Sequence, residues 1–242
     1  MLGFLNADHY HAQAKDAIIM RFLSQLPAGE KVLDVGAGQM PYKKYCGHLR
    51  YMSQDFGKYD GAGDGKGLQV GKFSTSEVDV LSDITEIPLP DKSQDNIICT
   101  EVLEHIFDPS AAIREMNRLL RPNGRILISV PGTSFLHFSP YHYYTGFKDN
   151  YFEKAFLANG LKIVEIHKTG SVYTEIALYL WFVMHKLAKC ISPWKSRITF
   201  QFLVAAISPI ILVLLGVDRV GWLKIEGLEA GLTVIGIKTE EK

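Results

Sequence analysis

The chain has 242 residues, 47% of them hydrophobic, and its 26 basic side chains balance 26 acidic ones. This length suits one large domain or one domain with an elaboration, and the apolar content excludes a disordered chain. A net charge near zero argues against a dedicated nucleic-acid binder, which needs a basic face. Three scattered cysteines (Cys46, Cys99 and Cys190) are too few for a disulfide framework or a zinc site, so we expect an intracellular protein without a metal.

The first sixteen residues lack the basic start, apolar core and small-residue cleavage site of a signal peptide. We therefore expect a cytoplasmic protein, unless a later segment holds it at a membrane.

The first part of the chain alternates helical and extended patterns. The predicted elements are a helix over 8–26, a buried parallel strand over 31–38, a short helix over 41–49, and a strand over 51–54 that ends at Asp55. Residues 56–77 are irregular and rich in glycine, which predicts a mobile surface loop. The acid and glutamate positions of a calcium loop are absent there, so we reject calcium.

The second part continues the alternation. Strands are predicted at 78–81, 96–102, 125–130, 161–167 and 231–238, helices after Asp108–Pro109 and at 149–158, and a turn at 121–124. Strands that alternate with helices of about ten residues form right-handed βαβ units. The predicted fold class is therefore α/β, with a mostly parallel sheet covered by helices on both faces.

The glycines at the end of the first strand indicate a nucleotide-type site. A dinucleotide fingerprint has three glycines, but Pro41 stands where the third would be, after Gly36 and Gly38. The acid Asp34 within the strand is also unusual for a dinucleotide turn. Taken alone, this glycine motif does not exclude a nicotinamide-dependent oxidoreductase.

Five motifs follow one another in order: Asp34–Gly38, Asp55, Asp83–Pro88, Asp95–His105 and Leu119–Pro131. Together they resemble the class I S-adenosylmethionine-dependent methyltransferases, in particular the small-molecule branch with VLEHI and LLRPNG segments. The resemblance covers roughly residues 28–168. It implies a Rossmann-like, seven-stranded sheet whose last strand is antiparallel beside the sixth, with S-adenosylmethionine as cofactor and S-adenosylhomocysteine as product.

The resemblance also implies cofactor-binding roles. The two glycines would lie against the methionine part, with Asp34 toward its amino end. Asp55 would accept the ribose hydroxyls, a task that suits a carboxylate at a strand end. Further along, Asp83 would take the adenine amino group, Ile84 would lie against the ring, and Glu101 would lie beside the cofactor. Each of the aspartates has an alternative role as a cap of a backbone turn.

Methyl transfer from a sulfonium requires alignment and, for some acceptors, removal of a proton. Candidate bases are His105 and His142, with Tyr143 and Tyr144 as further possibilities. The alternatives are a histidine that supports the strand–helix turn and an aromatic cluster that belongs to the core. The sequence assigns no definite base.

Two apolar segments, 174–187 and 198–217, precede the last strand. A single membrane crossing would separate that strand from its sheet, and a double crossing would send the basic linker across, against the positive-inside tendency. We expect a helical hairpin on the membrane surface or over the active site. The alternative is a buried cap or a homodimer interface. The expected domains are 1–170, the hairpin 171–217, and the strand segment 218–242.

The sequence therefore predicts a methyltransferase that acts on a small-molecule, lipid-linked or glycan-linked acceptor, with oxygen as the methylated atom. We expect no nucleic-acid partner. We expect a cytoplasmic location, and the alternative is peripheral contact with the inner face of a membrane. A non-catalytic cofactor-binding scaffold and, less favoured, an NAD-dependent oxidoreductase remain as alternatives.

Overall fold

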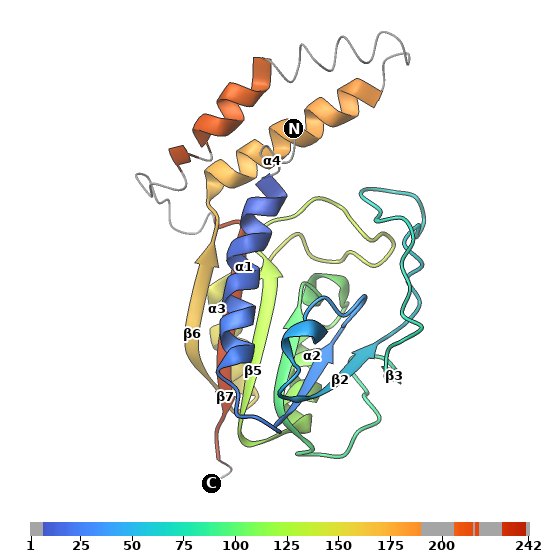
Figure 1. Cartoon of the computed structure of the whole chain (residues 1–242), viewed down its shortest axis with the longest axis vertical. Helices are drawn as coiled ribbons and strands as arrows, with labels where there is room; N and C mark the ends of the chain where they lie inside the picture. The colour runs from blue at the N-terminus through green and yellow to red at the C-terminus, as the bar shows by residue number, and fades with distance from the viewer. Residues whose placement is uncertain (1–6, 190–205, 215, 218–228, 241–242) are drawn as a thin grey trace. The chain divides into compact units, whose positions relative to one another are not determined.

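The computed structural model describes residues 7–189, 206–214, 216–217 and 229–240. The chain divides into two compact units (Figure 1). The core unit comprises residues 16–167 and 231–242, and the second unit comprises residues 1–15 and 168–230. The expected domain bounds of 1–170, 171–217 and 218–242 stay a prediction.

The sheet has seven strands in the order β3-β2-β1-β4-β5-β7-β6. Their bounds are β1 Lys31–Val35, β2 Arg50–Asp55, β3 Val80–Leu81, β4 Gln94–Thr100, β5 Leu120–Pro131, β6 Leu161–Thr169 and β7 Gly231–Lys238. Neighbours from β3 to β5 pair in parallel, and β7 pairs antiparallel with β5. The predicted α/β fold with a mostly parallel seven-stranded sheet is confirmed.

The helices are α1 Ala7–Ser24, α2 Pro109–Leu119, α3 Asp149–Ala158 and α4 Val172–Lys189. Helix α2 begins as the sequence predicts, with Pro109 in its first turn and Asp108 accepting a hydrogen bond from the Ala111 backbone N–H over 3.0 Å. This start directs the helix back along the sheet, and its apolar stripe faces the core.

Two apolar layers cover opposite faces of the sheet, because alternate strand residues point to opposite sides. In β1, Leu33 and Val35 join the core on the side of α2 and α3, while Val32 joins the core on the side of α1. The same alternation continues in β4, where Ile97 and Ile98 belong to different layers. Helices therefore cover both faces, as expected.

Some predicted boundaries were wrong. The expected helix over 41–49 is reduced to a 3₁₀ turn, Lys43–Tyr45, which has no side-chain cap. The expected turn at 121–124 lies within β5, where it forms a bulge: Gln94 pairs with Leu120, but Asn96 pairs with Arg125. Residues Leu103–His105, directly after β4, form a second 3₁₀ turn, η3.

In the second unit, α4 covers the first expected hairpin segment, and residues 206–214 of the second segment are helical. Residues 198–205 of that segment lie outside the described residues. Val183, Ile210, Leu212 and Val213 expose between 52% and 65% of their surface. Among the described helices, none combines the length and the apolar character that a bilayer crossing needs.

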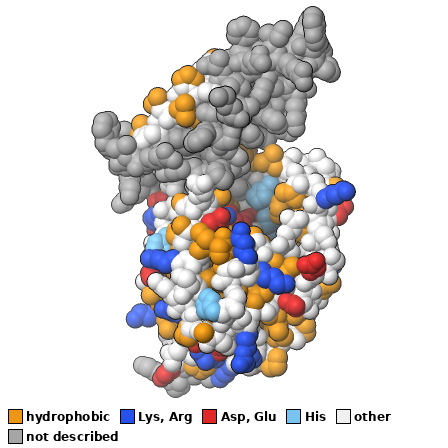
Figure 2. Space-filling model, in the orientation of Figure 1, with side chains coloured by type: hydrophobic (Ala, Val, Ile, Leu, Met, Phe, Trp, Pro, Cys, Tyr) orange, Lys and Arg blue, Asp and Glu red, His pale blue; other side chains and the backbone are white. Residues whose placement is uncertain are grey.

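The surface of the core unit is mixed in character. On the face shown in Figure 2, basic and acidic side chains are interspersed with hydrophobic ones. The same view shows hydrophobic side chains exposed in the described part of the second unit. The first feature suits a soluble surface, and the second marks the second unit as a candidate contact region.

Candidate functional site

A cavity of about 380 Å³ opens in the core unit where β1, β2 and β4 end. The carboxyl ends of neighbouring parallel strands are the usual ligand site of such sheets, and this volume falls within the range of small-molecule pockets. Of the residues with predicted roles, eight line the cavity: Gly36, Gly38, Asp55, Asp83, Ile84, Glu101, His105 and Tyr143. Asp34 and His142 are not part of this lining.

The glycine loop after β1 requires residues without a side chain. Gly36 has φ +69°, and a Cβ there would lie 2.4 Å from Val102 Cγ2. Gly38 has φ +52°, and a Cβ there would meet the ring of Phe73 at 3.0 Å. A left-handed backbone and a close neighbour both exclude larger residues. The loop therefore brings bare backbone to the cavity wall.

Two consecutive side chains at the end of β2 hold this loop. Gln54 Oε1 accepts a hydrogen bond from the Gly36 N–H over 3.3 Å, and Asp55 Oδ2 accepts one from the Gly38 N–H over 3.0 Å. Asp55 Oδ1 also accepts the Gly57 N–H over 2.9 Å. Because each carboxylate oxygen has two lone pairs, Asp55 keeps acceptor capacity toward the cavity. The sequence did not indicate the role of Gln54.

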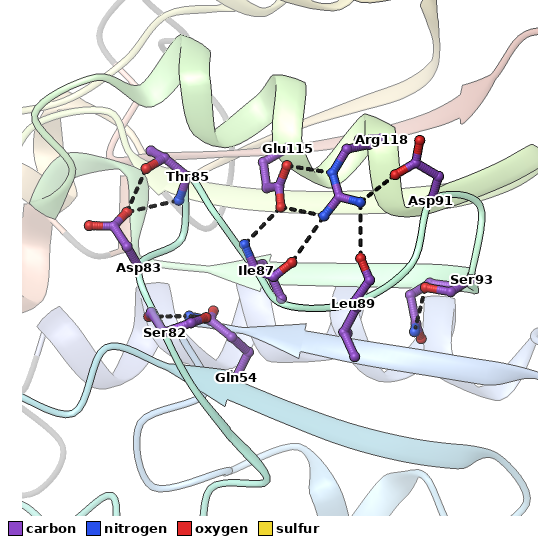
Figure 3. Close-up of polar contacts among 11 residues, drawn as sticks. Gln54, Ser82, Asp83, Thr85, Ile87, Leu89, Asp91, Ser93, Glu115 and Arg118 are labelled. Atoms are coloured by element: carbon purple, nitrogen blue, oxygen red, sulfur yellow. Dashed lines mark hydrogen bonds and ion pairs between the residues drawn. The ribbon is translucent and has the colours of Figure 1, made fainter.

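Asp83 begins the loop that follows β3 (Figure 3). Its Oδ1 accepts hydrogen bonds from the Thr85 N–H over 2.8 Å and from the Thr85 hydroxyl over 2.7 Å. These two donors hold the pKa of Asp83 below its ordinary value, so the side chain is a carboxylate at neutral pH. The neighbouring Ile84 side chain is buried and lines the cavity.

Helix α2 fixes the continuation of this loop through Glu115 and Arg118, which pair with each other, and Arg118 also pairs with Asp91 of the loop. Glu115 Oε1 accepts the Ile87 N–H over 2.7 Å, and Arg118 Nη2 donates to Glu115 Oε1 over 2.6 Å. The Arg118 guanidinium also donates to the Ile87 carbonyl at 3.0 Å and to the Leu89 carbonyl at 2.9 Å. Figure 3 shows the Glu115 and Arg118 side chains meeting the loop backbone. The position of Asp83 and Ile84 thus depends on α2.

Asp34 faces Tyr51 instead of the cavity. Its side chain is 1% exposed, and Oδ2 accepts the Tyr51 hydroxyl over 2.7 Å. Burial raises the pKa of Asp34 to about 7, against the effect of the Tyr51 hydrogen bond, and the nearby Asp55 adds to the rise. The expected role of Asp34 toward the methionine amino end stays a prediction.

Glu101 lines the cavity directly after β4 and has a left-handed backbone, with φ 55°. Ser129 of β5 holds it, since its carbonyl accepts the Glu101 N–H over 2.9 Å and its hydroxyl donates to Glu101 Oε1 over 2.9 Å. A left-handed conformation is costly for a residue with a side chain and persists only where its surroundings enforce it. The side chain is thereby held at the cavity wall.

Aromatic residues from two distant segments also form part of the cavity wall. Tyr59 stacks on Phe138 with ring centroids 4.5 Å apart, and Phe56 contacts Tyr141 edge-on at 5.0 Å. The glycine-rich segment 56–77, expected as a mobile surface loop, instead supplies part of this wall through Phe56, Tyr59 and Phe73. Its aromatic residues among many glycines were the available sequence signal. Tyr141 and Tyr143 place the expected acceptor segment in the wall as well.

His105 lies in this aromatic wall. Its Nδ1 is 2.6 Å from the Tyr141 carbonyl, and its ring stacks on Phe138. Burial, together with the neighbouring His137 and His142, lowers the pKa of His105 to about 3, so its imidazole is a weak base at neutral pH. Burial also lowers the pKa of His142. Their catalytic roles stay predictions. His137, which the sequence did not single out, packs against both rings.

Comparison with known proteins adds a family to this geometry. The methyltransferase domain family matches residues 7–182. A probable S-adenosylmethionine-dependent methyltransferase of Mycobacterium tuberculosis is 37% identical over 59 residues, which are 24% of this chain and 21% of that protein. The ubiquinone biosynthesis O-methyltransferase of Pseudomonas aeruginosa is 30% identical over 109 residues, 42% of this chain and 44% of that protein. The chain thus matches about a fifth of the first relative's length and less than half of the second's.

Solved structures share the fold at low identity. A SAM-dependent methyltransferase from Archaeoglobus fulgidus superposes with a TM-score of 0.54 at 16% identity, covering 93% of this chain and 94% of that one. The cyclase SpnF superposes with a TM-score of 0.53 at 16% identity, covering 93% of this chain and 82% of that one. These likenesses concern the fold, and one fold hosts different reactions.

Proposed function

The chain belongs to the S-adenosylmethionine-dependent methyltransferases, and from this premise we propose that it methylates an oxygen of an amphipathic acceptor held against the aromatic wall of its cavity. The observation that carries this proposal is the lining of the cavity, which includes both a polar set of glycines and carboxylates and an aromatic set. The polar set suits the cofactor, and the aromatic set suits an apolar or aromatic acceptor.

The polar set fits S-adenosylmethionine. The glycine loop leaves a cradle that a Cβ at Gly36 would close against Val102. Asp55 lies at the end of β2 and lines the cavity, so its carboxylate would accept hydrogen bonds from the two ribose hydroxyls. Asp83, a carboxylate at neutral pH, and the apolar Ile84 offer an amino-group acceptor and a flat contact for the adenine. Together these residues suit the ribose and the adenine of the cofactor and leave room for its methionine part.

When bound, S-adenosylmethionine supplies a methyl group on a sulfonium, which is activated for in-line displacement. The residues of this chain would then bind, orient and exclude water. The loop bonds from Gln54 and Asp55 hold the cofactor cradle in one conformation, and the stacked pair Tyr59 and Phe138 is part of the aromatic set. Because the pKa of His105 is about 3, alignment contributes more to this mechanism than proton removal by that ring.

The acceptor class follows from the wall. Phe56, Tyr59, Phe138 and Tyr141 line the cavity with aromatic rings, which favours a phenol or a similar hydroxylated ring with an apolar substituent. The partial match to a ubiquinone biosynthesis O-methyltransferase supports oxygen as the methylated atom. A lipid-linked acceptor would agree with the apolar side chains exposed on the second unit, which we propose as a peripheral membrane contact.

The first experiment is calorimetric titration of the purified chain with S-adenosylmethionine and S-adenosylhomocysteine. We expect micromolar binding, at least about tenfold weaker in Asp55→Ala, since a charged acceptor is lost. Glu86→Ala is the matched control, because Glu86 is an exposed acid of the same region outside the cavity wall. Absence of binding by folded wild-type protein would contradict the proposal, and binding of NAD instead would favour an oxidoreductase.

The second experiment follows methyl transfer from the labelled cofactor to phenols with and without isoprenoid chains. We expect transfer to phenols, with chain-bearing phenols as the better acceptors. Cofactor binding without transfer to any member of the panel would favour the non-catalytic alternative.

A further inference from the structure

Three histidines meet beside the cavity although the sequence predicts no metal site. His105 comes from η3, directly after β4, and His137 and His142 come from the segment between β5 and α3. Each offers one ring nitrogen, and these three atoms all lie within 4.8 Å of one another. Only His105 also lines the cavity. The cluster is therefore a feature of the tertiary structure, next to but separate from the cofactor cradle.

Two of the rings are oriented by backbone carbonyls. His105 Nδ1 is 2.6 Å from the Tyr141 carbonyl oxygen, and His137 Nδ1 is 2.7 Å from the Phe135 carbonyl oxygen. A carbonyl only accepts, so in each neutral ring Nδ1 carries the proton and Nε2 carries the lone pair. Metal-binding histidines are held in this way, with the outer nitrogen donating to a carbonyl or carboxylate.

A buried carboxylate faces both lone pairs. The Glu104 side chain is 1% exposed, and its Oε1 lies 3.7 Å from His105 Nε2 and 4.0 Å from His137 Nε2. A cation between these three atoms would interact favourably with the carboxylate charge. Glu104 Oε1 thus lies within 4.0 Å of both Nε2 atoms.

His142 completes the set. Both of its ring nitrogens are buried and have no hydrogen-bond partner among the described residues. Buried polar atoms nearly always have a partner, so such a ring needs an explanation. Aromatic packing accounts for the contact of His142 with His137, with centroids 4.5 Å apart. It does not account for two buried ring nitrogens without a hydrogen-bond partner among the described residues.

We propose that His105, His137 and His142, with Glu104, form a binding site for a divalent transition-metal ion, with Zn²⁺ the preferred ion. Three imidazoles and one carboxylate suit such ions, whereas Mg²⁺ prefers oxygen ligands. Tetrahedral zinc with bonds of about 2.0–2.1 Å places its ligand atoms roughly 3.3 Å apart. The three histidine nitrogens, which lie within 4.8 Å of one another, would accordingly draw together on binding, and Glu104 Oε1 would approach the ion from its place 3.7 Å from His105 Nε2 and 4.0 Å from His137 Nε2.

The test is titration of the metal-stripped, untagged full chain with Zn²⁺ and, separately, with Mg²⁺, together with elemental analysis after dialysis. We expect one Zn²⁺ per chain and at least about tenfold weaker binding in His137→Ala and His142→Gln. His48→Gln is the matched control, because His48 is exposed and lies outside the cluster. Failure of the wild-type chain to bind Zn²⁺, or undiminished binding in both cluster variants, would overturn the proposal.

A second measurement covers the case in which the variants do not fold, as judged by circular dichroism. Co²⁺ added to the wild-type chain should give the intense visible absorption of a four- or five-coordinate ion with nitrogen ligands. The weak spectrum of hydrated Co²⁺ would overturn the proposal. Both measurements omit cofactor and acceptor, so their outcome is independent of the proposed methyl transfer.

Discussion

The backbone N–H of Gly38 donates a hydrogen bond to Asp55 Oδ2 over 3.0 Å, which ties the loop after β1 to the end of β2. The two residues lie in different strand–loop units, and the parallel pairing of β1 with β2 brings them together. Asp55 is thus both a wall of the cavity and a support of the glycine cradle. Loss of its carboxylate would affect cofactor binding directly and through the loop.

Gly36→Ala should destabilise the chain by about 1–3 kcal/mol and weaken S-adenosylmethionine binding, since it forces a Cβ against Val102 at φ +69°. Urea unfolding and calorimetry measure the two effects. Gly47→Ala is the control, because no atom lies within 4 Å of a Cβ at that position. Adding Val102→Ala to Gly36→Ala should recover part of the loss. A Gly36→Ala variant that is as stable as the wild type and binds S-adenosylmethionine equally well would contradict the proposed role of this loop in cofactor binding.

Arg118→Met should weaken S-adenosylmethionine binding and lower the free energy of unfolding by about 1–3 kcal/mol, because Glu115 and two loop carbonyls lose their charged partner. Calorimetry and urea unfolding report both quantities. Arg114→Met tests the same chemical change at an exposed position of α2. Equal effects of the two substitutions would show that the contacts of Arg118 do not order the loop.

The buried Asp34 should make stability depend on pH. Its pKa is raised from 3.8 to about 7 in the folded chain, so between these values the folded state holds a proton that the unfolded state has lost. The contribution of Asp34 to stability is therefore complete below pH 3.8 and is lost as pH rises through about 7.

Asp34→Asn isolates this effect, since the amide does not titrate. The unfolding free energy of the variant minus that of the wild type should rise between pH 5 and pH 7 and level off above. Urea unfolding at several pH values measures this difference. A difference that stays constant across the range would mean that the carboxyl group titrates near its ordinary pKa in the folded chain.

The exposed apolar residues of the second unit should mediate membrane contact. Leu212→Ser combined with Val213→Ser should reduce sedimentation with anionic liposomes several-fold, and removal of residues 174–217 should abolish it. Leu157→Ser serves as control, because Leu157 is 81% exposed on the core unit. If the wild-type chain does not sediment, or if the deletion sediments equally well, the membrane proposal fails. Light scattering would then test a homodimer.

Local signals in the sequence were enough for most of the sheet and for part of the site. Asp108 and Pro109 predict the start of α2 because capping involves neighbouring residues only. Apolar runs predict buried parallel strands, and the glycines after β1 predict a backbone that a ligand can approach. Where local signals were weak, the prediction failed: without a side-chain cap, the expected helix after Pro41 shortened to one turn.

Contacts between distant segments were decided only by the tertiary structure. The bulge in β5 follows from the register of β5 with β4. This register depends on both strands and cannot be predicted from either one alone. The segment 56–77 forms part of the cavity wall because Phe56 packs against Tyr141 and Tyr59 packs against Phe138. The sequence by itself determined the family fold and the order of its motifs, since these depend on short-range patterns. The convergence of His105, His137 and His142 required strand register and loop packing, because side chains far apart in sequence meet only when the whole sheet is assembled.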